Sequence, residues 1–305
     1  MSSVTAVPPV PPLPLTQAQR RAVWLPYAAL GTVLLLWGFG PPLSKLITGS
    51  PLTISFCRLW TSALTMVVVQ YLMGARPTAK AIRGGFLGGL AFGANSIVFF
   101  IALRHASIAT LTVIGSLQPG LVMLGASQFF GERLTRWGVA WTAVAIGGAG
   151  IAVLGAGAAV HTDLLGVLCS AGSLIAMTGY FLASKAARKT LGAGEYIMAV
   201  MFWAAICATP VIILGGGLGH FNTLGRGDWF WMFIMLVGPG LTGQVLMGWA
   251  VKYVPVSLSS MILLGSTVVS IAAAWPIHGE TLAPLQFLGG GIALGGVGAV
   301  VSRRS

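Results

Sequence analysis

The residues of this chain that could bind a solute are few, and only one of them is charged. Arg58 is the only basic residue inside a long apolar segment, where its guanidinium could pair with a substrate carboxylate. An unpaired charge at that depth costs at least about 2.5 kcal/mol, so a partner is expected. The alternative is an interfacial or helix-packing arginine, because a long side chain near a helix end can still reach water.

Uncharged hydrogen-bonding side chains lie near the middle of other apolar segments. They are Asn95, Gln118, Gln244, Ser266 and Thr267. Because amides and hydroxyls in an apolar medium need partners, these groups could line a substrate cavity at the interface between the two halves of the chain. Hydrogen bonding between helices, worth about 0.6 kcal/mol on average, is the alternative.

Aromatic residues and helix-breaking residues occur in the same segments. The deeper aromatic residues, which could stack on a flat or apolar substrate, are Trp37, Trp60, Tyr180 and Trp203. The candidate hinges are Gly40, Pro41, Pro119, Gly120, Pro239 and Gly240. Proline removes a backbone donor and kinks a helix, and a membrane protein tolerates this where neighbouring helices or a cavity satisfy the freed groups. For the aromatic residues the alternative is a side chain that faces lipid or a neighbouring helix, and for the candidate hinges it is close packing without motion.

The sequence carries no motif for metal, nucleotide or covalent chemistry. Its three cysteines, Cys57, Cys169 and Cys207, are far apart and form no cluster with histidine. No zinc-protease, serine-hydrolase or P-loop motif is present. No Asp or Glu falls near the middle of an apolar segment, which disfavours strict proton coupling. We therefore expect a protein that is not an enzyme and uses no cofactor or metal.

Composition identifies the kind of element that must position these residues. Of the 305 residues, 56% are hydrophobic and 7% are charged, whereas soluble domains have about 25% charged residues. The chain is predicted to be an all-α membrane protein, because the alternating pattern of a membrane barrel is missing. Its net charge of +12 is interpreted as loop charge that sets topology. The expected partners are the lipid bilayer and a small-molecule substrate, with no nucleic acid.

Ten segments are apolar and about as long as the 20 residues that cross a bilayer. They are residues 23–44, 52–73, 82–103, 107–130, 137–159, 164–184, 195–215, 229–250, 256–278 and 284–302. Most basic residues lie at one set of segment ends, and only Lys45, Arg104 and Arg226 lie at the other, which places both termini in the cytoplasm. Residues 1–22, which are rich in proline, are predicted to be a disordered cytoplasmic tail, and residues 303–305 a second tail.

The sequence also contains an internal repeat. Residues 102–153 align with residues 250–301 without a gap at a shift of 148 positions, so that Glu132 falls on Glu280 and Gly148 on Gly296. Two units, 23–159 and 160–302, are predicted, each with five spans. Because five is odd, the units are inverted, with Glu132 on the cytoplasmic side and Glu280 on the outer side. Inverted repeats are typical of secondary transporters.

In these features the chain resembles the EamA-type proteins of the drug/metabolite transporter superfamily. The resemblance covers residues 24–302 and is strongest at 102–110 (ALRHASIAT) and 249–257 (WAVKYVPVS). Pro119 matches the family's mid-helix proline, and Thr267 stands at the corresponding place of the second repeat. The resemblance implies a multi-pass transporter of the bacterial plasma membrane. Such a protein would export a small metabolite by alternating access. Aromatic or neutral amino acids are the candidate substrates.

Two other functions fit part of the pattern. An exchanger of phosphorylated sugars or nucleotide-sugars would need more basic residues in the cavity than Arg58. A non-transporting scaffold or lipid-handling subunit would need no cavity at all. The glycines at 147, 148 and 150 and at 295, 296 and 298 predict close helix contacts. Such contacts could also join two copies, so the protein is expected to be a monomer or a homodimer.

Overall fold

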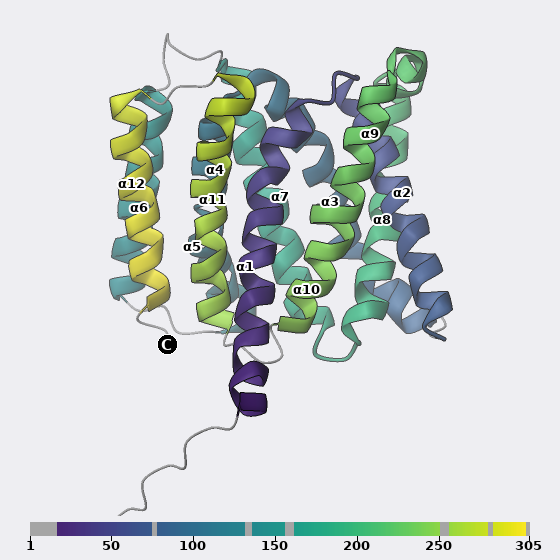
Figure 1. Cartoon of the computed structure of the whole chain (residues 1–305), viewed down its shortest axis with the longest axis horizontal. Coiled ribbons are helices and arrows are strands. Elements are labelled where there is room, and N and C mark those ends of the chain that lie inside the picture. The colour runs from purple at the N-terminus through teal and green to yellow at the C-terminus, as the bar shows by residue number, and fades with distance from the viewer. Residues whose placement is uncertain are drawn as a thin grey trace, which may run out of the picture.

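The computed structural model describes residues 17–74, 78–131, 136–155, 162–250, 256–279 and 283–302. Within these ranges the chain forms helices and no strand. The helices stand side by side in one bundle, joined by short connections (Figure 1). Glu132 and Glu280, which define the predicted inversion of the repeats, lie outside the described residues.

The helices follow the predicted segments closely. Those of the first half are α1 (Gln17–Lys45), α2 (Pro51–Leu72), α3 (Ala79–His105), α4 (Ile108–Gly115), α5 (Gln118–Phe130) and α6 (Arg136–Gly155). Those of the second half are α7 (Leu164–Ala187), α8 (Ala193–Leu214), the 3-10 helix η1 (Gly217–Thr223), α9 (Arg226–Met235), the π-helix η2 (Leu236–Thr242), α10 (Gly243–Ala250), α11 (Val256–His278) and α12 (Pro284–Ser302). Helix α1 begins ahead of the predicted start at residue 23, so residues 17–22 are helical rather than disordered.

Five helical stretches of the described chain are long and apolar enough to cross a membrane. They are Pro51–Leu72, Ala79–His105, Ile108–Phe130, Leu164–Ala187 and Gly194–Leu214. Each coincides with a predicted span. The other five predicted spans also fall on helices, namely α1, α6, the α9–η2–α10 series, α11 and α12, and their crossing of the membrane stays a prediction.

Proline breaks two of the predicted spans, but not a third. Helix α4 ends at Gly115 and α5 starts at Gln118, directly before Pro119. The second break is η2, which contains Pro239. In α1, by contrast, the helix continues through Pro41 and Pro42 to Lys45, so Gly40 and Pro41 do not end it, and their part as a hinge stays a prediction. These prolines still remove two donors from the helical hydrogen-bond pattern, because proline has no backbone N–H.

The largest buried cluster lies between α2, α3, α7 and α8. Its buried side chains include Leu59, Phe92, Tyr180 and Tyr196. Glycines on α3 allow α8 to approach closely: a Cβ added to Gly85 would lie 2.5 Å from Cβ of Ala199 and 2.9 Å from that residue's carbonyl carbon. Small residues between helices are typical of membrane bundles, in which tight packing replaces the hydrophobic effect.

The α6–α12 contact joins the two halves through equivalent residues. A Cβ added to Gly148 would lie 2.5 Å from the backbone nitrogen of Ala293, and one added to Gly296 would lie 2.9 Å from that of Ala145. Each contact is the counterpart of the other under the 148-residue repeat. Because Ala145 faces Gly296 and Gly148 faces Ala293, the two helices are antiparallel; they lie together at one edge of the bundle (Figure 1). Gly148 and Gly296 therefore pack within the chain, and the predicted homodimer stays a prediction.

Candidate functional site

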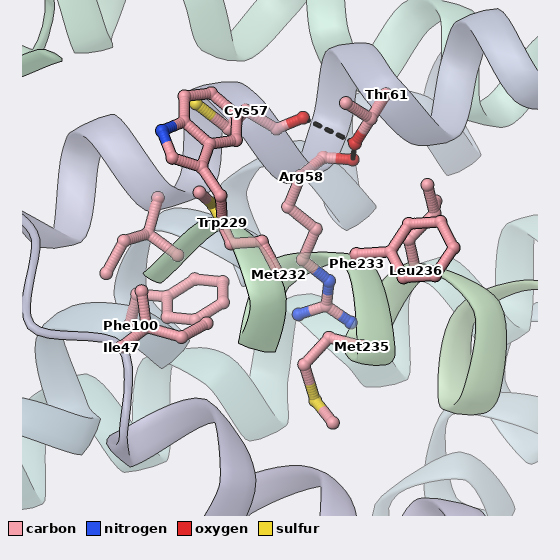
Figure 2. A pocket seen from close by; sticks show the side chains of 11 residues that line it. Ile47, Cys57, Arg58, Thr61, Phe100, Trp229, Met232, Phe233, Met235 and Leu236 are labelled. Carbon is pink, nitrogen blue, oxygen red and sulfur yellow. Dashed lines mark hydrogen bonds between the residues drawn. The ribbon is translucent and has the colours of Figure 1, made fainter. Parts of the chain in front are cut away.

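A small cavity surrounds the side chain of Arg58 (Figure 2). Its volume is about 140 Å³, roughly ten times the space that one water needs, so it could admit a small solute. It lies between α2, α3 and the α9–η2 helix, and its lining residues are Ile47, Ile54, Cys57, Arg58, Thr61, Phe100, Trp229, Met232, Phe233, Met235 and Leu236. We call this cavity the Arg58 pocket.

Helical periodicity explains which side chains line the pocket. On α2, Ile54, Arg58 and Thr61 are three or four residues apart and therefore share one face. On α9 and the start of η2, the lining residues Trp229, Met232, Phe233 and Leu236 have the same spacing. The pocket is thus the gap between two apolar helix faces, and Arg58 contributes its only charge among the described lining residues.

The guanidinium of Arg58 has no counter-charge in the part of the chain that the structure describes. Its Cζ lies 5.5 Å from the ring centroid of Phe100, a cation–π contact worth about 0.5–2 kcal/mol. Among the described residues no carboxylate and no hydrogen-bond acceptor pairs with it. Figure 2 shows the guanidinium directed away from the backbone of α2 toward Met235. A cation in apolar surroundings is costly without a partner, so this pocket is suited to a small anion.

The π-helix η2 forms one end of the pocket wall. Pro239 lacks a backbone donor. Gly243 N donates to the carbonyl oxygen of Gly238, five positions back, which is the hydrogen-bond spacing of a π-helix. The indole Nε1 of Trp37 donates to the carbonyl oxygen of Pro239 over 3.1 Å. Trp37, predicted to contact substrate, therefore satisfies the backbone at this break and is not among the residues that line the Arg58 pocket.

A buried carboxylate, that of Asp228, lies directly before the pocket residue Trp229. Oδ1 of Asp228 accepts hydrogen bonds from the backbone nitrogen of Thr48 (2.6 Å) and from its hydroxyl (3.1 Å), and Oδ2 accepts from Gly225 N (2.8 Å). Asp228 is only 5% exposed. Burial acts to raise its pKa, but the hydrogen bonds from Thr48 and Gly225 outweigh this and hold the pKa below its ordinary value. The carboxylate is therefore ionised at neutral pH.

Thr48 lies in the connection between α1 and α2, and Arg104 of α3 binds the same connection. Its Nη2 donates to the carbonyl oxygens of Ile47 (2.5 Å) and Gly49 (2.7 Å). Neither Asp228 nor Arg104 is among the site residues that the sequence predicts. One local signal was available, since an acidic residue three positions after Gly225 and ahead of an apolar run is typical of a helix N-terminus.

Four of the other predicted site residues make contacts between helices instead. Asn95 Oδ1 accepts from Ser173 (2.7 Å), which joins α3 to α7. The indole Nε1 of Trp60 donates to Thr209 (3.0 Å), and that of Trp203 donates to the carbonyl oxygen of Ile82 (2.7 Å). Tyr180 is buried in the cluster between α2, α3, α7 and α8. Their predicted part in substrate binding remains a prediction.

The remaining predicted residues lie elsewhere in the bundle. Gln118 begins α5, at the break before Pro119, and is half-buried. In α11, Thr267 is buried and Ser266 is half-buried. Gln244 belongs to α10, and its side chain is outside the described part of the structure. Of the predicted substrate-binding residues, the structure places Arg58 alone in the lining of the Arg58 pocket.

The Trp60–Thr209 contact gives an expectation that competes with substrate binding, namely that this tryptophan has a structural role. Trp60→Phe should remove one hydrogen bond and lower the free energy of unfolding by about 0.5–1.5 kcal/mol. Thermal unfolding in detergent should report this loss, while transport by the folded protein should be unchanged. Weaker substrate binding at unchanged stability would instead place Trp60 in the pathway.

Comparisons with known proteins agree with this architecture. The model of the EamA-like transporter family matches residues 24–154 and 164–302. A protein of Streptantibioticus cattleyicolor named "Probable terminal-alkyne amino-acid exporter" is 23% identical over 291 residues, which are 93% of this chain and 94% of that protein. A solved crystal structure with 18% sequence identity shares the fold, with a TM-score of 0.63 over 93% of this chain and 98% of its own. The chain therefore belongs to the EamA-like transporter family, and one match to the family model lies in each half, as the sequence resemblance implied.

Proposed function

We propose that this protein exports a small metabolite with a carboxylate group across the bacterial plasma membrane by alternating access. Aromatic and neutral amino acids are the first candidates. Membership of a transporter family and the similarity to a protein named as an amino-acid exporter support export. The Arg58 pocket supports the choice of substrate class.

The observation that carries the proposal is the guanidinium of Arg58, which lies in an apolar cavity and has no counter-charge among the described residues. A carboxylate can accept two parallel hydrogen bonds from a guanidinium, which restores the partners that both groups lose on leaving water. The apolar part of the substrate would then lie against Met232 and Phe233. A phosphorylated sugar carries more charge and more hydroxyls than this lining could pair, which disfavours that alternative.

The proposed mechanism requires the ten spans to form two inverted units with both termini in the cytoplasm. Antiparallel packing of the repeat-related helices α6 and α12 supports this arrangement, because twin helices of inverted units run in opposite directions. Two units that pack in this way can rock against each other. The breaks at Pro119 and Pro239 are the proposed hinges.

A substrate panel in proteoliposomes tests the function. Purified protein should exchange labelled neutral and aromatic amino acids, and it should accept their amides and sugar phosphates poorly. Liposomes without protein provide the background rate. Exchange of sugar phosphates in preference to amino acids would support the rival exchanger, and absence of flux for every member of the panel would support the scaffold.

A further inference from the structure

The contacts around Asp228 join the connection between α1 and α2 to α9 and α3, and each of these three parts carries a residue that lines the Arg58 pocket. We call this cluster the clasp and define it as Thr48, Arg104, Gly225 and Asp228. Asp228 accepts hydrogen bonds from the amide and the hydroxyl of Thr48 and from the amide of Gly225. Arg104 donates to the carbonyl oxygens on either side of Thr48. The α1–α2 connection is therefore held by charged groups from α9 and α3.

Two members of the clasp, Thr48 and Asp228, lie directly beside a residue that lines the pocket, and Arg104 lies one helical turn from another. Thr48 follows Ile47, and Asp228 precedes Trp229. Arg104 is one helical turn beyond Phe100 on α3. A change in the clasp would therefore move three pocket walls relative to one another, although no atom of the clasp lines the pocket itself.

The clasp has the properties of a contact that can open. Thr48 is exposed, whereas Ile47 beside it is buried. Water can therefore replace Thr48 as a donor to the carboxylate when the connection moves, so Asp228 does not lose all its partners. The connection also fits closely when closed, because a Cβ added to Gly49 would lie 2.4 Å from a methyl carbon of Leu224.

We propose that Asp228 is a gating residue, whose hydrogen bonds to Thr48 hold the α1–α2 connection closed over the Arg58 pocket. Release of these bonds opens the pocket at that end of the bundle. The proposal rests on the proposed function in one respect, namely that the Arg58 pocket is the transport site. Asp228 acts by positioning the pocket walls and does not contact the substrate.

Cysteine labelling can test this gate, because Cys57 lines the pocket and is only 6% exposed. The full-length protein with Cys169→Ser and Cys207→Ser carries Cys57 as its single thiol. It would be reconstituted in proteoliposomes and treated with a membrane-impermeant maleimide from each side in turn. Asp228→Asn should increase the labelling rate of Cys57 about tenfold from one side only, equal to about 1.4 kcal/mol in the opening equilibrium.

Asp163 provides a matched control at the N-terminus of α7. Its carboxylate also accepts a helix amide, that of Gly166 (2.7 Å), and contacts Nδ1 of His105 (2.8 Å). Asp163 neither lines the pocket nor contacts the α1–α2 connection in the described contacts. Asp163→Asn should therefore leave the labelling rate of Cys57 unchanged.

Three results would overturn the gate. They are an unchanged rate in Asp228→Asn, an equal increase in Asp163→Asn, and an increase from both sides. If Asp228→Asn fails to fold, Thr48→Val removes the hydroxyl but keeps the amide, and it should raise the rate about two- to threefold; no increase in this variant would likewise reject the proposal. The labelling assay does not require transport. If the labelling rates change as expected but no member of the substrate panel is transported, the gate is supported and the proposed function is rejected.

Discussion

Arg58→Ala should weaken transport of a carboxylate substrate by about ten- to a hundredfold. A hydrogen bond to a charged group contributes about 1.5–3 kcal/mol, and in the Arg58 pocket no other cation among the described lining residues can replace the guanidinium. The corresponding amide of the same substrate lacks the charge and should lose little. Exchange of the acid and its amide, measured side by side in proteoliposomes, gives this difference directly.

Two further variants separate a charge effect from a general loss of function. Arg58→Lys keeps the charge but presents a single ammonium, so it should recover part of the activity without the two parallel hydrogen bonds. Arg83→Ala removes an exposed arginine from α3 and should have no effect. Equal losses for acid and amide in a well-folded Arg58→Ala protein would show that Arg58 supports the helices and does not select the substrate.

Gly148→Ala should lower the free energy of unfolding by about 1–3 kcal/mol, the usual cost of overpacking. The added Cβ would lie 2.5 Å from the backbone nitrogen of Ala293 and 2.8 Å from the carbonyl oxygen of Gly289. Backbone atoms cannot rotate away as a side chain can, so α6 and α12 would have to separate. Unfolding of the purified protein in detergent, followed by circular dichroism, measures the loss.

The neighbouring glycine is the matched control for this prediction. A Cβ added to Gly147 meets nothing within 4 Å. Gly147→Ala should therefore be neutral or stabilising by about 0.5–1 kcal/mol, because alanine restricts the unfolded chain and favours a helix. The opposite signs at adjacent positions identify the face of α6 that packs on α12. Equal destabilisation by both variants would contradict the described packing.

The sequence by itself determined the class of the protein and much of its organisation. A charged fraction of 7% cannot cover a water-facing surface, and apolar segments of about 20 residues form helices whatever their neighbours. The repeat at a shift of 148 positions and the family resemblance were also recognisable from the sequence. The same holds for the breaks at Pro119 and Pro239. These properties follow from local composition, because a proline removes its backbone donor wherever it stands. Arg58 was identified for the same reason, as a charge within an apolar segment.

The tertiary structure alone decided which polar groups meet. Asn95 and Arg58 have similar sequence surroundings, yet Asn95 bonds to Ser173 while Arg58 faces a cavity without a counter-charge among the described residues. The role of Asp228 could not be read locally, because its partner Thr48 is 180 positions away. A helix has the same sequence pattern whichever neighbour covers a given face. Pairing across helices depends on their mutual rotation and depth, which the packing of the whole bundle sets.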